Sequence, residues 1–414
     1  MINGANTGFM LLAASLVMLM TPGLAFFYGG LVGRSNTLTI MIQSFASMGI
    51  TTVLWWLVGY SLCFSGGANG IYGNFHVAFL RHVGPESIYA PSGIPLVVLI
   101  AYQMMFAIIT PALITGAFTN RVTFKAFLIF LVVWQLFVYY PFVHMLWGGG
   151  MLAHWGVRDF AGGIVVHASA GFAALASVLY VGRRKFFDMP HNIPFIALGT
   201  GLLWFGWYGF NAGSELKVDH ITALAFLNTD LAASFAATTW LFVEWWHAKK
   251  PHFVGLLTGA VAGLATITPA AGYVPIYASV VIGIASGAVC YYAIQLKNRL
   301  HWDDALDVWG VHGVGGLLGI CMLGVFASRA INPAGGTGLI HGAGSFFGKQ
   351  VAAGVGCSLY AFGFTYAMLK VIDLVTPVRV GEEAERGLDA AMHGESAYEF
   401  DQELPTPASA APSL

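Results

Sequence analysis

Two stretches of the chain correspond to each other, Asp159-Phe-Ala-Gly-Gly-Ile-Val-Val-His167 and Asp304-Ala-Leu-Asp-Val-Trp-Gly-Val-His312. In both, an aspartate precedes a histidine by eight residues, and a valine stands directly before the histidine. An ionisable side chain deep in a membrane segment is costly and by default marks a functional site. The matching pair therefore indicates two related halves of the chain that share one site.

The composition around these stretches is that of a membrane protein. Hydrophobic residues make up 57% and charged residues 9% of the 414 residues, whereas about 25% of an ordinary soluble domain is charged. Eleven apolar segments are long enough to cross about 30 Å of hydrocarbon. They cover roughly 7–33, 37–64, 95–118, 124–146, 162–182, 193–213, 221–246, 253–271, 274–296, 306–328 and 344–374. The sequence predicts an all-α polytopic membrane protein with one transmembrane domain over residues 1–378.

Lysine and arginine placement sets the orientation, because cytoplasmic loops carry an excess of both. With the N-terminus outside, thirteen lie inside: Arg34, Arg121, Lys125, Arg183, Arg184, Lys185, Lys249, Lys250, Lys297, Arg299, Lys370, Arg379 and Arg386. Five lie outside: Arg81, Arg158, Lys217, Arg329 and Lys349. The bias predicts an N-out, C-in protein of the cytoplasmic (inner) membrane.

Residues 379–414 form a polar tail of different character. They carry eight acids against two arginines, a net charge near −6, and the end, 405–414, is rich in Pro, Ala and Ser. Such composition predicts a disordered end. The acidic tail either lies against the basic inner loops or is solvated, and charge alone does not decide between the two.

The four cysteines indicate neither a disulfide framework nor a metal site. Cys63, Cys290, Cys321 and Cys357 all lie in or at the ends of apolar segments, without CxxC spacing. We expect buried small apolar side chains, no bound metal and no cofactor.

The paired stretches open the fifth and the tenth predicted helix, so each repeat has five helices. An odd number forces the second copy to start from the opposite side, which gives an inverted repeat. We expect one repeat over about 7–182, the other over about 193–328, and a peripheral eleventh helix. Eight residues at about 1.5 Å each place either histidine about 12 Å below its aspartate, towards the membrane midplane.

Two buried neutral imidazoles can hydrogen-bond each other and a small polar solute. A permanently charged ion such as K⁺ would need a cage of carbonyls or carboxylates, and the predicted helices contain few acids. Ammonium can instead shed a proton and cross as ammonia, which avoids a desolvation cost of tens of kcal/mol for a bare ion. The alternative is that both histidines are structural.

Further motifs resemble those of the ammonium transporter/methylammonium permease/Rhesus family, in its bacterial ammonium transporter branch. They are Thr21-Pro-Gly-Leu-Ala-Phe-Phe-Tyr-Gly-Gly-Leu-Val32, Trp147-Gly-Gly-Gly150, Gly209-Phe-Asn-Ala-Gly-Ser214, Asp303-Asp304, Glu385-Arg-Gly-Leu-Asp389 and His393-Gly-Glu-Ser-Ala-Tyr398, besides both histidine stretches. The resemblance covers residues 5–400. It implies a homotrimer of eleven-helix protomers in the lipid bilayer, each with its own pore for ammonium or ammonia. It also implies methylammonium as a further substrate. It implies no nucleic-acid partner.

The resemblance also assigns roles to residues. It implies an outer cation site of Phe106, Trp147 and Ser214, in which aromatic faces attract a cation and the hydroxyl accepts a hydrogen bond from ammonium. Phe106 and Phe210 would stack as a gate, and Trp207 and Tyr102 would line the vestibule. His167 and His312 would line the pore, while Asp159, Asp304 and Asp307 would be electrostatic and structural groups. Asp159 also fits a helix cap.

Three residues depart from the family pattern. Tyr102 replaces a more usual phenylalanine. Glu215, after the site serine, stands where a small residue is more usual, and either concentrates cations outside or is only a solvated loop acid, the reading we favour. Asp230 lies near mid-depth, where a hydrogen bond to a neighbouring helix or subunit is the favoured interpretation and a second proton or cation route the alternative.

For the tail, the resemblance implies regulation. Arg386, Gly387, Asp389, His393 and Tyr398 belong to motifs that couple the three pores beneath the trimer. The cytoplasmic face would bind a trimeric PII signalling protein.

Other classes of protein fit less well. A bis-histidine haem protein would leave the aromatic and serine site without a purpose, and a hydrolase would show a GxSxG or HExxH motif, which the sequence lacks. An ammonium sensor remains an alternative, although such members usually carry an added signalling domain. We expect an ammonium transporter and no enzyme, and whether transport carries net charge stays open.

Overall fold

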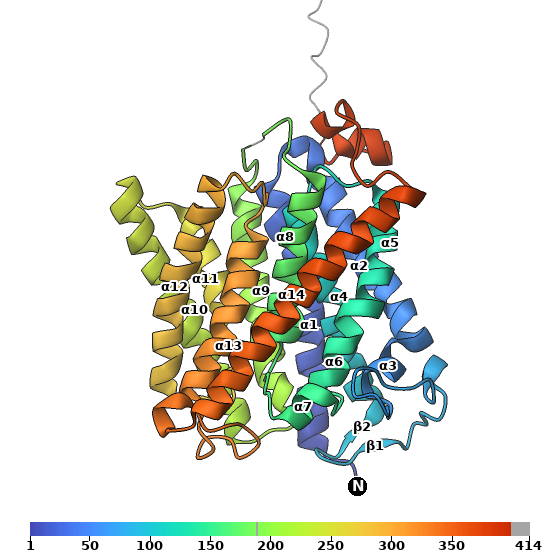
Figure 1. Ribbon diagram of the computed structural model, residues 1–414, viewed down its shortest axis with the longest axis vertical. Helices are drawn as coiled ribbons and strands as arrows, with labels where there is room; N and C mark the ends of the chain where they lie inside the picture. Colours follow the sequence, from blue (N-terminus) through green and yellow to red (C-terminus); the bar gives the residue numbers. More distant parts are fainter. Residues whose placement is uncertain (188, 399–414) are drawn as a thin grey trace, which may run out of the picture.

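The fold is a bundle of long helices in a computed structural model that describes residues 1–187 and 189–398. The N-terminus lies at one end of the bundle and the C-terminal helical turns lie at the other (Figure 1). An odd number of membrane crossings requires this arrangement. The predicted disordered end, residues 405–414, lies outside the described residues.

The helices follow the predicted segments closely. They are α1 (Gly4–Leu31), α2 (Thr37–Leu54), α3 (Tyr60–Phe64), α4 (Leu96–Phe118), α5 (Phe124–Trp134), α6 (Tyr140–Leu146), α7 (Met151–Trp155), α8 (Ser169–Val181), α9 (Ile193–Ala212), α10 (His220–Ala248), α11 (Phe253–Ile267), α12 (Ile276–Arg299), α13 (Gly315–Phe326) and α14 (Gly344–Val375). A two-stranded antiparallel hairpin of β1 (Ile88–Tyr89) and β2 (Ile94–Pro95) precedes α4.

Ten helical segments of the described chain are long and apolar enough to cross a membrane. The predicted segment 253–271 corresponds to α11, which has 15 residues and is therefore only about 22 Å long. The prediction of a polytopic helical membrane protein is confirmed, with α11 as a short eleventh segment.

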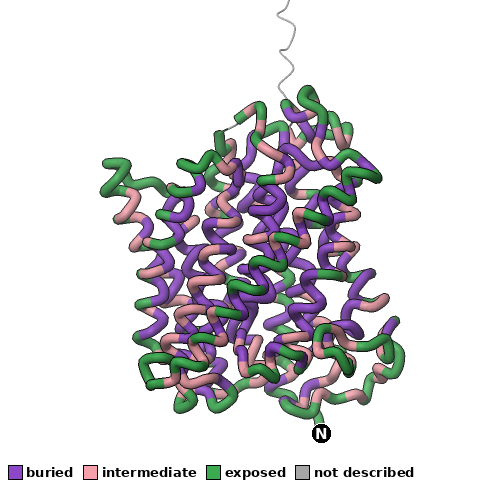
Figure 2. The backbone as a smooth tube through the Cα atoms, viewed as in Figure 1, coloured by how far each residue is buried: buried purple, intermediate pink, exposed green. Residues whose placement is uncertain are grey.

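The exterior of the bundle is as apolar as a membrane protein requires. Buried residues fill the centre, while the outer faces carry exposed and half-buried residues (Figure 2). Large apolar side chains on these faces are exposed, among them Leu11, Phe45, Phe235 and Leu359. Such surface is stable only against lipid or another protein. Helix α14 runs obliquely across the bundle (Figure 1) and packs on α8, α13 and α5.

Both histidine stretches form wider, π-helical turns at the start of a crossing. His167 lies in η5 (Gly163–Ala168), which continues into α8, and His312 lies in η7 (Trp309–Val314), which continues into α13. Single π turns inside helices are rare and frequently occur at functional sites. The two occur at matching positions, as the predicted repeat requires.

The two halves pack on each other reciprocally, since η5 contacts α13 and η7 contacts α8. A glycine stands four residues after each histidine, at Gly171 and Gly316. A Cβ atom on Gly171 would lie 2.0 Å from the backbone nitrogen of Gly313, and one on Gly316 would lie 2.7 Å from Cβ of His167. These glycines therefore allow a backbone-to-backbone crossing of the two histidine helices. The residue limits of the two repeats stay a prediction.

Substitution of Gly171 by alanine tests this crossing. Because the new methyl group would overlap backbone that cannot move aside, we expect a loss of about 1–3 kcal/mol or more of stability. The measurement is thermal unfolding of the detergent-purified protein. Gly201→Ala in α9 is the matched control, because a Cβ there meets nothing within 4 Å. Equal melting temperatures for the two variants would contradict the proposed close crossing.

Candidate functional site

An open cavity of about 480 Å³ lies at the N-terminal end of the bundle. Its lining includes Phe106, Trp147, Ser214 and Asp159, together with Tyr89 of the hairpin that Figure 1 places at this end. The three residues of the predicted outer cation site thus come from α4, the end of α6 and the turn after α9, and they face one cavity.

Two phenylalanines form the floor of this outer cavity. The rings of Phe106 and Phe210 stack with centroids 4.1 Å apart and planes 29° apart. Trp147 stands at 86° to Phe106, with centroids 5.7 Å apart. Phe106 lines the outer cavity, whereas Phe210 lines the next space inward. The stacked pair therefore separates the two spaces, as the predicted gate requires.

The hydroxyl of Ser214 is oriented by the end of α9. It donates to the carbonyl of Phe210 at 2.8 Å, which leaves its lone pairs for other donors. The hydroxyl of Tyr102 lies 3.3 Å from that of Ser214 and donates to the carbonyls of Gly209 and Phe210. Tyr102 is fully buried and is not among the residues that line the outer cavity. It supports the serine from behind rather than lining the vestibule, where we expected it.

The carboxylate of Asp159 serves as a helix cap. It accepts hydrogen bonds of 2.7–3.2 Å from the backbone N–H groups of Gly162, Gly163, Ile164 and Val165. Its backbone carbonyl accepts the indole N–H of Trp147 at 2.9 Å. One residue therefore fixes both the start of the His167 helix and an aromatic wall of the outer cavity.

Below the phenylalanine pair lies a narrow, mostly apolar passage of about 10 Å³. Its lining includes Phe210, Trp207, His167 and His312, besides aliphatic side chains from α1, α4 and α11. About 10–15 Å³ is the space that one water molecule needs. Trp207 stacks on His167 with centroids 5.5 Å apart. Trp207 therefore lies on the inner side of the gate and not in the outer vestibule, where we expected it. The reason is that α9 runs outward, so a residue one turn before Phe210 lies further inward.

The two histidines meet in this passage. Their Nδ1 atoms are 3.2 Å apart and their rings lie 16° from parallel. One ring must donate and the other accept, so in the neutral pair one Nε2 carries a proton and the other does not. The Nε2 atom of His167 is buried and has no hydrogen-bond partner among the described residues. The pair can therefore offer one donor and one acceptor to a small solute.

A third cavity, of about 260 Å³, continues from His312 towards the other end of the bundle. It shares His312, Phe27 and Val261 with the narrow passage. A constriction that holds both histidines thus lies between the two wide cavities and opens towards the inner one.

The comparisons with known proteins identify the family of the chain. A model of the Ammonium Transporter Family matches residues 8–398. The chain belongs to the ammonium transporter family. It is 45% identical to an ammonium transporter of Bacillus subtilis over 95% of this chain and 98% of that protein. Its fold is similar to the crystal structure of Mep2 from Saccharomyces cerevisiae, with a TM-score of 0.87, 33% identity and coverage of 97% and 93% of the two chains. It is also similar to a solved sensor Amt protein, with a TM-score of 0.86, 28% identity and coverage of 94% and 98%. This ammonium transporter family is not a family of enzymes.

The inner end of the second histidine helix is held by charges rather than by a full cap. The carboxylate of Asp304 accepts the N–H of Trp309 at 2.7 Å. Lys297 donates to the carbonyl of Asp304 at 2.9 Å and to the carboxylate of Asp307 at 2.6 Å. Asp307 adopts a left-handed backbone with φ of 60° and lines the inner cavity. These three charged residues position the turn that leads to His312.

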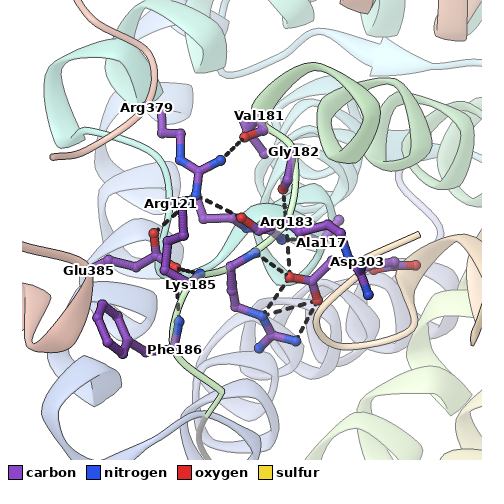
Figure 3. Close-up of polar contacts among 12 residues, drawn as sticks. Ala117, Arg121, Val181, Gly182, Arg183, Lys185, Phe186, Asp303, Arg379 and Glu385 are labelled. Atoms are coloured by element: carbon purple, nitrogen blue, oxygen red, sulfur yellow. Dashed lines mark hydrogen bonds and ion pairs between the residues drawn. The ribbon is translucent and has the colours of Figure 1, made fainter. Parts of the chain in front are cut away.

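Next to them, Asp303 joins the loop between α8 and α9 to the bundle (Figure 3). Arg184 donates to its carboxylate through Nε and Nη2, the latter at 2.6 Å. The buried Arg121 lies 3.5 Å from the same carboxylate and donates to the carbonyl of Gly182. No local sequence pattern predicts this network, because its members are far apart along the chain.

The described part of the tail is attached to the same loop (Figure 3). Glu385 accepts the backbone N–H groups of Lys185 and Phe186 and pairs with Arg379. Arg379 in turn donates to the carbonyls of Val181 and Arg183. The tail therefore lies against the inner loops, one of the two arrangements that charge left open.

The predicted tail residues contact the inner loops as well. Asp389 accepts the backbone N–H groups of Leu38 and Thr39 at the start of α2, where a helix favours negative charge. Further contacts join Arg386 to Ser35 and to the ring of Phe186, His393 to Phe124, and Tyr398 to His191 and Arg34. Gly387 lies beside Ser35, since a Cβ on this glycine would meet the Ser35 side chain at 3.6 Å. All these contacts are within one chain.

Asp303 should make stability depend on pH. Burial alone would raise its pKa, but hydrogen bonds from Arg184 and the charges of Arg121 and Arg184 outweigh burial and lower the pKa. Stabilisation is therefore complete above the unfolded value of about 3.9 and is lost as pH falls through the lower, folded-state pKa. We expect Asp303→Asn to cost about 3 kcal/mol at pH 7, because two arginines lose their counter-charge.

Thermal unfolding of Asp303→Asn across pH measures both effects. Glu382→Gln, at an exposed tail acid, is the control and should unfold like the parent. A variant with the parent's melting temperature at pH 7 would show that the ion pairs contribute nothing.

Asp230 is held by a neighbouring helix, the favoured one of its two interpretations. Its carboxylate accepts the hydroxyl of Tyr208 at 2.6 Å and the indole N–H of Trp204 at 3.2 Å, both from α9. Asp230→Asn keeps an acceptor for both donors, so we expect ammonium transport within about twofold of the parent. Abolished transport in a variant that unfolds at the parent's temperature would instead support a second proton or cation route.

Proposed function

We propose that this protein recruits ammonium in the outer cavity, deprotonates it near the phenylalanine gate and conducts ammonia past the two histidines. Ammonia is then reprotonated in the inner cavity. The observation that carries the proposal is the order of spaces: a wide outer cavity, a stacked phenylalanine pair, a one-molecule passage with two histidines, and a wide inner cavity.

The outer cavity suits a cation that donates hydrogen bonds. Phe106 and Trp147 present aromatic rings to it, each worth about 0.5–2 kcal/mol to a cation depending on its solvation. The hydroxyl of Ser214 donates its hydrogen bond to the carbonyl of Phe210, so its oxygen remains free to accept one. Ammonium can donate a hydrogen bond to that oxygen and K⁺ cannot, which supports selection at this point.

The passage beyond the gate suits a neutral molecule. Its lining is mostly aliphatic and aromatic, and it has room for one small molecule. A hydrated ion does not fit, and a bare ion would cost tens of kcal/mol. In this proposal the N–H bond breaks before the passage: the electron pair stays on ammonia and the proton goes to solvent water in the open outer cavity.

In this proposal the proton that ammonium loses crosses the protein separately from the ammonia molecule, by transfer from group to group. The Nδ1–Nδ1 hydrogen bond between His167 and His312 lets a proton shift from one ring to the other. With water on both sides, such a shift would carry net charge inward in each cycle. Asp159 contributes indirectly, as the anchor of Trp147 and of the His167 helix.

The geometry does not favour the haem alternative. Two axial nitrogens bound to one iron at about 2 Å each would be about 4 Å apart with a porphyrin between them. The facing nitrogens of His167 and His312 are 3.2 Å apart, in a passage of about 10 Å³.

Family resemblance supports further parts of the proposal. We propose a homotrimer in the cytoplasmic membrane, with methylammonium as a second substrate. A PII signalling protein would bind the cytoplasmic face, where basic loops and the docked tail lie together. The tail contact at Glu385 supports a regulatory role, because this acid holds the loop whose Arg184 lines the inner cavity.

A sensor with little net transport is the second candidate, favoured by the likeness to a sensor Amt protein. Both candidates would bind ammonium in the outer cavity. They differ in whether ammonium drives a current or uptake through the passage.

Replacement of His167 by alanine tests the proposed mechanism. We expect a saturable ammonium-dependent current from the parent in a supported membrane, because a proton follows each ammonia. His167→Ala should lose that current at least tenfold or let K⁺ pass, since the proton route is broken and the passage is widened. Current is recorded after ammonium and K⁺ pulses to the reconstituted protein.

A silent parent with correctly folded protein would contradict electrogenic transport. Uptake of labelled methylammonium would then separate neutral ammonia conduction from a sensor.

A further inference from the structure

Glu215 lies at the edge of the outer cavity, directly after Ser214. Both residues belong to a short turn, η6 (Gly213–Glu215), that continues α9. The side chain of Glu215 is 11% exposed and lines the cavity together with Phe106 and Trp147. This burial contradicts the reading of Glu215 as a solvated loop acid, the alternative that the sequence favoured.

Of the two acids that line this cavity, Glu215 is the one whose carboxylate can bind a further cation. Among the described residues that line the cavity, the acids are Asp159 and Glu215, and none is a lysine or arginine. The carboxylate of Asp159 already accepts four backbone N–H groups. Glu215 instead carries an ion pair that can exchange.

The partner of Glu215 is the side-chain ammonium of Lys217. It lies 3.3 Å from Oε1 of Glu215 and 2.9 Å from Oδ2 of Asp219, and its side chain is 41% exposed. Asp219 is fixed, because its other oxygen caps α10 at Ile221 and Thr222. Lys217 can therefore leave Glu215 and keep its shorter ion pair with Asp219.

We propose that Glu215 is an entry site for ammonium and methylammonium, in which the arriving cation replaces the ammonium group of Lys217. The arriving cation pairs with Glu215 while Lys217 stays paired with Asp219, so each of the two carboxylates then has a cation of its own. Ser214 is the adjacent residue, so the cation passes from Glu215 to the aromatic and serine site without leaving the cavity. The inference rests on the proposed function of that cavity.

Opposite charge changes at the two partners test the entry site. Glu215→Gln should raise the half-saturating concentration of ammonium about threefold to fivefold at low salt, the size expected for one charge at close range in a wet site. Lys217→Met should lower it about twofold, because Glu215 loses its competitor. Both effects should shrink in 0.5 M salt, at which the screening length is well below 10 Å.

Two measurements on the full-length protein keep the outcomes distinct. One is the concentration dependence of the ammonium-driven current in reconstituted protein, where the change should appear in half-saturation rather than in maximal current. The other is equilibrium binding of labelled methylammonium to purified protein, which needs no transport. Glu86→Gln is the control, since it removes the same charge from an exposed outer residue that does not line the cavity.

The results separate this proposal from the proposed function. Unchanged binding and half-saturation in both Glu215→Gln and Lys217→Met would overturn the entry site while leaving transport intact. Shifts in the same direction in both variants would also overturn it, because exchange requires opposite signs. If the two variants shift methylammonium binding as expected, but the parent shows neither current nor uptake, the entry site is supported and transport is contradicted.

Discussion

The molecule depends on one close crossing, where the backbone of α8 touches the backbone of η7 at Gly171 and Gly313. Because the two backbones touch there, imidazoles on different helices come close enough to share a 3.2 Å hydrogen bond. Side chains larger than hydrogen would separate the helices and open the passage. The π turns η5 and η7 hold both histidines at this crossing, and such turns frequently occur at functional sites.

The two ends of this crossing are anchored by different means, although the sequences match. Asp159 accepts four backbone N–H groups and makes the outer end rigid. At the inner end Asp304 accepts the N–H of Trp309, and Lys297 bridges Asp304 and Asp307. Ion pairs of this kind respond to neighbouring charges more readily than a backbone cap does. The inner end is also where the loop held by Asp303 and the tail meets the bundle, so any regulation through the tail acts at the adaptable end.

Hydropathy and spacing predicted much of this from the sequence. Long apolar runs located the helices, and the repeated Asp and His spacing correctly brought His167 and His312 together. The vestibule positions predicted for Tyr102 and Trp207 were wrong. One turn before Phe210 leads inward along α9, and helical spacing does not tell whether Tyr102 borders the outer cavity or lies behind Ser214. The network of Arg121, Arg184 and Asp303 was missed altogether. Its contacts join segments more than a hundred residues apart, and no local pattern encodes such pairing.

The proposed selectivity is divided between two environments because neither can achieve it alone. Aromatic faces and a serine acceptor attract a cation by a few kcal/mol, far less than the tens of kcal/mol that an unhydrated ion costs in an apolar passage. An outer site strong enough to offset that cost would never release its cation. A site of modest affinity beside a passage that admits only neutral molecules avoids the difficulty, provided that the cation can lose a proton. Ammonium can and K⁺ cannot, so the same apolar passage that excludes ions also selects between these two.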